Sequence, residues 1–281
     1  MFKFPSLILV LFLSFACSKE EAQVNTSESE AHYRLGIEFA QYSLFENSID
    51  EFDLALKYDP SNIKAYNKKG LVLFGIKEYG KALEMFQKVI SLQPDHLQAH
   101  INMGMVSYME GNKDGAVRIW EKAIAIKEGD NDSKAINNIA NVYKEKGDYA
   151  KAVEYYTKAI DIDSRNSLFL NNLAESYRLL GNITKANEVL ARSAKMDPKS
   201  MMVHFNRGKL LKSENKHADA IEAFKQSLKI NPDYLEAYYE MASIYHSDKE
   251  NESALNVLEK ALALDPENGK YKDFRDKIKG S

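Results

Sequence analysis

The sequence predicts an all-α fold of about seven repeated helix pairs followed by a short terminal helix. Three observations lead to this prediction. A residue pattern recurs about every 34 residues over most of the chain. Within each repeat, a small residue, a second small residue twelve positions later and a large apolar residue four positions further on keep a fixed spacing. A proline closes most repeats, and self-similarity with this period is the signature of helical repeat proteins.

The register of the pattern sets the boundaries of the helix pairs. The repeats cover residues 29–266, and seven units begin at Ser29, Ile63, Leu97, Ser133, Ser167, Met201 and Leu235. The small residue of the first helix is Gly36, Gly70, Gly104, Ala140, Ala174, Gly208 or Ala242. The large residue of the second helix is Phe52, Phe86, Trp120, Tyr156, Leu190, Phe224 or Leu258. Small residues let two helices approach closely and the large residue fills the gap, so each pair is expected to pack tightly.

Prolines and the last residues of the chain define where the repeats end. The second helix of five units is closed by Pro60, Pro94, Pro198, Pro232 and Pro266, because proline cannot continue a helix. Residues 267–281 are predicted to form a C-terminal capping helix, in which Tyr271, Phe274 and Ile278 follow helical spacing.

The repeat resembles the tetratricopeptide repeat (TPR), and segments such as NNIANVYKEKGDYAKAVEYYTKAIDID (137–163) are close to the consensus of that family. The resemblance implies that the helix pairs stack into a right-handed α-α superhelix, a solenoid with a concave groove. Each pair cannot bury its apolar face alone, so the stack shares one continuous core.

One step of the repeat is longer than the others. Units three and four are 36 residues apart, the segment KEGDND (127–132) lies between them, and the closing proline is missing. The segment is interpreted as a longer loop, with a local change of superhelical pitch as the alternative. It lacks the glycine turn and the distal glutamate of a calcium-binding EF-hand loop.

The N-terminal residues have the form of an export signal. Residues 1–16 combine one basic residue, Lys3, with an apolar run that is too short to span a bilayer. The run ends at Ala16 and Cys17, the only cysteine, and this arrangement resembles a bacterial lipoprotein signal peptide, in which the cysteine becomes acylated. Ser14 and Phe15 depart from the commonest form of that motif, and an ordinary cleaved signal peptide is the alternative. Residues 17–28 are predicted to be a flexible tether.

The charge balance and the motifs exclude several classes of function. The chain has 38 basic and 41 acidic residues, and of the basic residues only Lys3 precedes Cys17. The processed chain is therefore mildly acidic, whereas a nucleic-acid binder would show a basic surface. His96 and His100 have the spacing of two ligands on one helix, but a zinc site needs three or four donors. The sequence contains no phosphate-binding glycine loop and no Cys–His pair within the repeats. We therefore expect no enzyme activity, no cofactor, no metal and no small-molecule substrate.

The resemblance also indicates which face of the first helices lines the groove. Polar residues on that face predict a peptide-binding surface that consists of Asn102, Asn138, Asn141, Asn172, Asn206, Lys144, Arg178 and Lys209. An asparagine amide can pair with both the C=O and the N–H of a peptide bond, although asparagine is also common at this position of the TPR consensus. Apolar residues predict a second surface that consists of Tyr33, Ile37, Leu71, Phe74, Met105 and Tyr108. A partner helix or strand, the N-terminal tether or a second copy of the chain would cover it.

Together these features predict a lipid-anchored interaction scaffold of the bacterial envelope that binds a peptide or a partner protein. The alternative is a soluble periplasmic chaperone or assembly factor with an ordinary signal peptide. No aspartate follows Cys17 directly, and in the lipoprotein family this favours the outer membrane. Lys19, Glu20 and Glu21 also resemble surface-export signals, so the protein could face the periplasm or the cell exterior.

Overall fold

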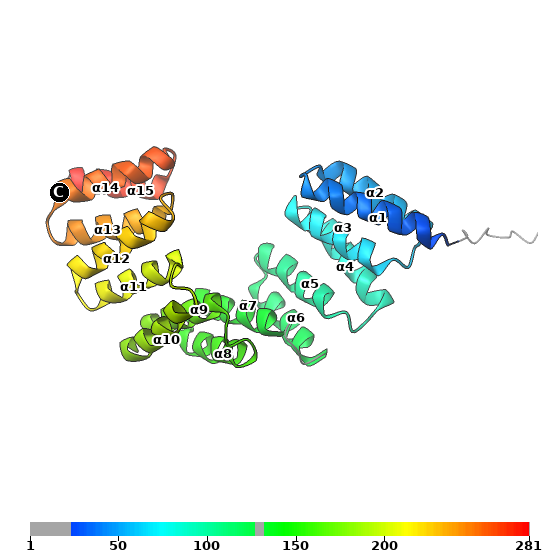
Figure 1. The fold of residues 1–281 in the computed structure, drawn as a ribbon, viewed down its shortest axis with the longest axis horizontal. Coiled ribbons are helices and arrows are strands. Elements are labelled where there is room, and N and C mark those ends of the chain that lie inside the picture. Colours follow the sequence, from blue (N-terminus) through cyan, green and yellow to red (C-terminus); the bar gives the residue numbers. More distant parts are fainter. Residues whose placement is uncertain (1–23, 127–131, 281) are drawn as a thin grey trace, which may run out of the picture. The chain divides into compact units, whose positions relative to one another are not determined.

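The computed structural model describes residues 24–126 and 132–280, and within these ranges it contains fifteen α-helices and no strand (Figure 1). The predicted all-α fold of helix pairs with a C-terminal helix is confirmed. The predicted signal peptide, Cys17 and most of the predicted tether lie outside the described residues. The chain forms two compact units, one up to Met85 and one from Phe86 onward, which are described separately.

The first unit contains α1 (Thr26–Gln41), α2 (Phe45–Tyr58), α3 (Ile63–Gly75) and the start of α4 (Tyr79–Leu92). The first helix begins inside the stretch that was predicted to be a tether, three residues before Ser29. Asn25 is the reason, because its side chain accepts a hydrogen bond from the backbone N–H of Glu28 at 3.2 Å and so caps the helix. The buried residues Phe52, Ala55 and Ala65 form the core of this unit.

The second unit contains the remaining helices. Their bounds are α5 (Leu97–Met109), α6 (Lys113–Ile126), α7 (Asp132–Glu145), α8 (Tyr149–Ile162), α9 (Ser167–Leu179), α10 (Ile183–Met196), α11 (Met201–Ser213), α12 (His217–Ile230), α13 (Leu235–Ser247), α14 (Asn251–Leu264) and α15 (Gly269–Lys279). Each first helix packs on the second helix of its own pair, and each second helix packs on the first helix of the next pair. Trp120, Tyr156, Leu190, Phe224 and Leu258 are buried between the two helices of their pairs.

The turns inside the helix pairs share one backbone conformation. Seven residues at equivalent repeat positions have a positive φ, namely Ser43, Lys77, Gly111, Gly147, Gly181, Asn215 and Lys249. This left-handed conformation suits glycine, whereas a residue with a Cβ atom is strained there by about 1–2 kcal/mol. Three units therefore have the residue type that the turn favours, and units such as the last one, with Lys249 at a φ of 65°, do not.

Replacing Lys249 by glycine is therefore expected to stabilise the second unit by about 1 kcal/mol, because the strain at the turn is removed. Urea denaturation followed by far-UV circular dichroism measures the change. Gly181→Lys, at the equivalent turn of another pair, is the matched control and is expected to destabilise by a similar amount. A free energy of unfolding that changes in the same direction in both variants would contradict the prediction.

Candidate functional site

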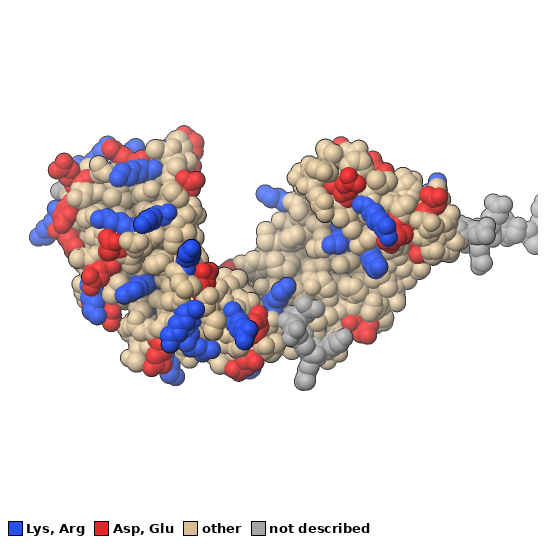
Figure 2. All heavy atoms as spheres, viewed as in Figure 1, with Lys and Arg blue, Asp and Glu red and all other residues tan. Residues whose placement is uncertain are grey.

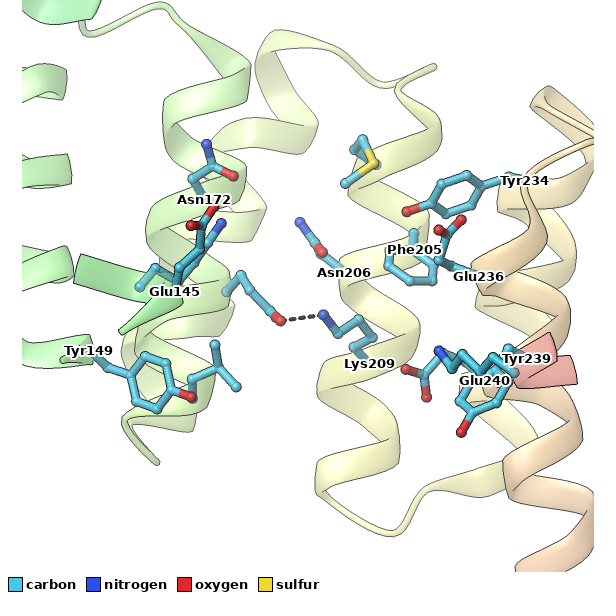
Figure 3. A pocket seen from close by; sticks show the side chains of 15 residues that line it. Glu145, Tyr149, Asn172, Phe205, Asn206, Lys209, Tyr234, Glu236, Tyr239 and Glu240 are labelled. Carbon is cyan, nitrogen blue, oxygen red and sulfur yellow. Dashed lines mark hydrogen bonds and ion pairs between the residues drawn. The ribbon is translucent and has the colours of Figure 1, made fainter. Parts of the chain in front are cut away.

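The first helices of the second unit line a cavity of about 420 Å³. Its walls come mainly from α7, α9, α11 and α13, and α15 contributes Lys270. The side chains that line it are largely polar or aromatic: Lys144, Glu145, Tyr149, Asn172, Glu175, Leu179, Met202, Phe205, Asn206, Lys209, Tyr234, Glu236, Tyr239, Glu240 and Lys270. Figure 3 shows Asn206 and Lys209 projecting from α11 towards the side chains of the neighbouring first helices. We call this surface the groove cavity.

The asparagines of the predicted peptide-binding surface connect successive repeats. The Nδ2 of Asn138 donates to the Met105 sulfur at 3.4 Å, that of Asn172 to the Asn137 side-chain oxygen at 3.4 Å, and that of Asn206 to the Asn171 carbonyl at 3.4 Å. Asn102 and Asn206 are only 7% and 6% exposed, whereas Asn138 and Asn172 are half-buried. Asn141 accepts a hydrogen bond from the Tyr156 hydroxyl. Most of these asparagines thus stabilise the stacking of the repeats, and Asn172 and Asn206 also line the groove cavity.

A charged cluster lies beside these asparagines. Arg178 holds Glu175 through two hydrogen bonds, from Nε at 2.8 Å and from Nη2 at 3.0 Å, and Lys209 pairs with the same carboxylate. Burial by itself would raise the pKa of Glu175, but the hydrogen bonds and charges of Arg178 and Lys209 outweigh it and lower that pKa. Glu175 is therefore ionised at neutral pH and joins α9 to α11.

Lys144 completes the cluster without an ion pair of its own. Its Nζ lies 5.8 Å from the centre of the Tyr156 ring and pairs with no carboxylate in the part of the chain that the structure describes. Burial lowers the pKa of Lys144, with a smaller contribution from the charge of Lys209, while Glu175 acts in the opposite direction. The predicted cations Lys144, Arg178 and Lys209 therefore come together, around one carboxylate.

Charges of both signs cover the face of the second unit that is seen in Figure 2. Many Lys and Arg side chains lie over α9 to α15, with Asp and Glu side chains among them. Ion pairs between neighbouring helices account for several of them, such as Lys212 with Glu240 at 2.6 Å and Lys146 with Asp114. The groove cavity is thus part of a mixed-charge surface.

The residues of the predicted apolar surface fall into two groups. In the first unit, Ile37 and Leu71 line a cavity of about 370 Å³, whereas Tyr33 packs on Phe52 and Phe74 packs on the ring of Tyr79. In the second unit, Met105 accepts the hydrogen bond from Asn138.

Tyr108, the other residue of that surface in the second unit, serves a polar contact. Its hydroxyl donates to the Glu145 carboxylate, and this hydrogen bond, with burial, raises the pKa of Tyr108 to about 12. Its ring contacts Trp120 with 6.3 Å between the centres. Tyr108 therefore links the third and fourth repeats, and its hydroxyl stays protonated at neutral pH.

Eleven of the fifteen residues that line the groove cavity are not among the predicted site residues, and three of these eleven lie outside the groove-facing positions of the first helices. Tyr149 is the first residue of α8, Tyr234 precedes α13 as its N-cap, and Lys270 belongs to the capping helix. None of these three occupies a groove-facing position of a first helix, and the predicted surface consists of such positions only. The repeat register contained a signal for Tyr149 alone, because aromatic residues start the second helices α2, α4 and α8.

The two histidines with the spacing of metal ligands have local structural partners instead. His96 caps α5 by accepting a hydrogen bond from the Ala99 N–H at 3.1 Å, and His100 contacts the Pro94 carbonyl at 3.0 Å. No group of three or more possible metal ligands occurs within residues 24–126 and 132–280. Among the same residues, no helix has the length and apolar character needed to cross a bilayer.

The tetratricopeptide repeat family matches this chain in four places, at residues 63–96, 133–166, 155–186 and 211–278. These matches cover more than half of the chain and agree with the helix pairs of the structure. The chain therefore belongs to the tetratricopeptide repeat proteins. No curated protein matches the sequence at a significant level.

Solved structures share the fold at low sequence identity. A tetratricopeptide repeat protein from Parabacteroides merdae is 14% identical, with a TM-score of 0.73 over 91% of this chain and 100% of that one. PilW, a type IV pilus biogenesis factor, is 20% identical, with a TM-score of 0.65 over 77% and 97%. The APC/C hetero-tetramer Cut9–Hcn1 contains a chain that is 18% identical, with a TM-score of 0.68 over 89% and 47%. This chain thus spans about half the length of that last relative.

Proposed function

We propose that this protein is a non-catalytic interaction scaffold of the bacterial envelope, that it is anchored by a lipid on Cys17, and that it binds a peptide or a partner protein in the groove cavity. The observation that carries the binding role is the cavity itself, which four successive first helices line with amide, phenol and charged groups. Such a mixture of a few polar groups with aromatic surface is typical of sites that bind other molecules.

The envelope role is supported by two further features. The apolar N-terminal run ends at the sole cysteine, as in lipoprotein signals. Lipoproteins of that kind carry at least two acyl chains, and two chains are enough for stable anchoring. The fold is shared with PilW, which is described as a type IV pilus biogenesis factor. Assembly of an envelope complex is therefore the setting that we propose, with the outer membrane as the location.

The asparagines of the predicted peptide-binding surface give the first test of the binding role. Asn138→Ala combined with Asn172→Ala is expected to weaken capture of partners from cross-linked envelopes about tenfold, because two half-buried amides are lost and that of Asn172 lines the groove cavity. Quantitative mass spectrometry of the captured proteins measures the change. Asn187→Ala, on an exposed site of α10, is the control and should leave capture unchanged. Identical partners in equal amounts from the double variant and the wild type would contradict a binding role of Asn138 and Asn172.

Metabolic labelling with radioactive palmitate tests the anchor separately. The wild-type protein is expected to incorporate label and to sediment with membranes, whereas Cys17→Ala should lose the label and enter the soluble fraction. A protein without label, or a Cys17→Ala variant that still sediments with membranes, would instead support the alternative of a soluble periplasmic chaperone or another mode of attachment.

A further inference from the structure

The carboxylates and cations around the groove cavity are not balanced. Four carboxylates line it, and three of them have cationic partners: Glu145 pairs with Lys113 at 2.9 Å, Glu240 pairs with Lys212, and Glu175 pairs with both Arg178 and Lys209. The fourth, Glu236, is exposed at the α13 end. Around Glu175, Arg178 and Lys209 share one carboxylate, and Lys144 of the preceding first helix adds a third cation without an ion pair. This part of the cavity therefore carries an excess of positive charge.

Lys144 is the cation of this cluster that forms no ion pair within the described residues. It is half-buried on α7, and no residue of the described chain forms an ion pair with it. A partly buried ammonium loses hydration and is stabilised when a negative charge comes close. Glu175 and Glu145 attract the Lys144 ammonium only from beyond ion-pair distance, because Glu175 pairs with Arg178 and Lys209 and Glu145 pairs with Lys113.

The surrounding groups indicate that the missing negative charge belongs to a peptide. The side-chain oxygen of Asn172 and the hydroxyls of Tyr149, Tyr234 and Tyr239 accept or donate no hydrogen bond in the described part of the chain, and all four side chains line the cavity. An amide oxygen can accept from a peptide N–H, and a phenol can donate to a peptide C=O. The ring of Phe205 adds apolar surface between them.

We propose that Lys144 binds a carboxylate of a peptide in the groove cavity, and that Glu175 limits the affinity because it already occupies the cations next to Lys144. This inference rests on the proposed peptide-binding function. A carboxylate at Lys144 forms a charge-assisted hydrogen bond, and the Asn172 amide lies on the next first helix. The carboxylate comes from an Asp or Glu side chain or from a free C-terminus.

A substitution of Glu175 is expected to change the peptide affinity in the opposite direction to a substitution of Lys144. Glu175→Gln removes this negative charge and leaves Lys209 and Arg178 without their carboxylate. Both cations are then available to the carboxylate of the peptide. Affinity for acidic peptides is then expected to rise several-fold, whereas a site in which Glu175 helped to bind the peptide would lose affinity. The sign of the change separates the two roles.

A mixture of synthetic random octapeptides, prepared once as C-terminal amides and once as free acids, tests the inference. The purified protein from residue 18 onward selects peptides, and mass spectrometry identifies them. The wild type is expected to enrich peptides with Asp or Glu, and fluorescence anisotropy on the best peptide should show about tenfold weaker binding for Lys144→Gln. Lys134→Gln removes the same charge from an exposed site of α7 that does not line the cavity, and it should bind as the wild type does.

Each outcome decides a separate point. Acidic peptides selected equally from both mixtures identify a side-chain carboxylate, and selection only from the free acids identifies a C-terminal one. Peptides selected without acidic enrichment, or unchanged by Lys144→Gln, would overturn this inference and leave peptide binding intact. Selection of no peptide at all would overturn peptide binding by the groove as well. If thermal melting shows that Glu175→Gln has lost structure, the comparison of Lys144→Gln with Lys134→Gln decides alone.

Discussion

Replacing Trp120 by alanine is expected to lower the free energy of unfolding by about 3–5 kcal/mol, because a large side chain that is only 1% exposed is lost from the core of its helix pair. The indole also donates a hydrogen bond from Nε1 to the Ile101 carbonyl at 3.0 Å, so the substitution leaves that acceptor without its partner. Urea denaturation followed by far-UV circular dichroism measures the change, since Trp120 is the only tryptophan and the variant has no indole fluorescence.

Trp120→Phe separates the two contributions. The phenylalanine ring fills most of the space but cannot donate the hydrogen bond, so a smaller loss of about 1–2 kcal/mol is expected. A repeat array can unfold in parts, and the full transition should therefore be compared with that of the wild type rather than its midpoint alone. A loss below about 1 kcal/mol for Trp120→Ala would show that the pair does not depend on this side chain.

Replacing Gly104 by alanine is the second change with a large expected effect. A Cβ atom at this position would overlap the indole of Trp120, with the ring Cδ1 at 2.5 Å. The indole is buried and hydrogen-bonded, so it cannot move away without cost, and a loss of about 1–3 kcal/mol is expected. Gly75→Ala is the matched control, since nothing lies within 4 Å of a Cβ atom at that helical position. It should stabilise by about 0.5–1 kcal/mol.

Other repeats of the same chain indicate how the overlap at Gly104 could be relieved. Alanine occupies the equivalent position in the fourth, fifth and seventh units, and in the last two of these the large residue is a leucine, with Leu190 after Ala174 and Leu258 after Ala242. Gly104→Ala combined with Trp120→Leu reproduces this combination and is expected to cost less than the sum of the two single changes. Strict additivity of the two changes would contradict a direct steric contact between positions 104 and 120.

The sequence showed that a small residue pairs with a large one in each helix pair, but it did not show why the small residue is glycine in some pairs and alanine in others. The spacing predicted that a small residue would face a large one in each pair. Glycine occurs where a Cβ atom would come within 3 Å of an aromatic ring, as at Gly36 with Phe52 and Gly208 with Phe224. The packing distance between two helices decides between glycine and alanine, and one sequence does not contain that distance.

In the groove, too, the sequence predicted one part of the arrangement and not another. Position in the repeat placed Asn172, Lys144 and Lys209 on one face, and all three line the groove cavity. It did not indicate that the Nδ2 groups of Asn138, Asn172 and Asn206 reach back to the preceding repeat. Such contacts join residues about 35 positions apart and depend on how far each helix is rotated in the stack.

The sequence by itself determined the all-α class and the arrangement in repeated helix pairs, because a repeat with a fixed period contains the same local packing pattern in every unit. Only the tertiary structure decided which polar side chains satisfy one another. It showed that Glu175 is shared by Arg178 and Lys209 and that Lys144 has no such partner among the described residues. The physical reason is that the pairing of charges depends on distances of a few ångströms between separate helices, which a one-dimensional period does not contain.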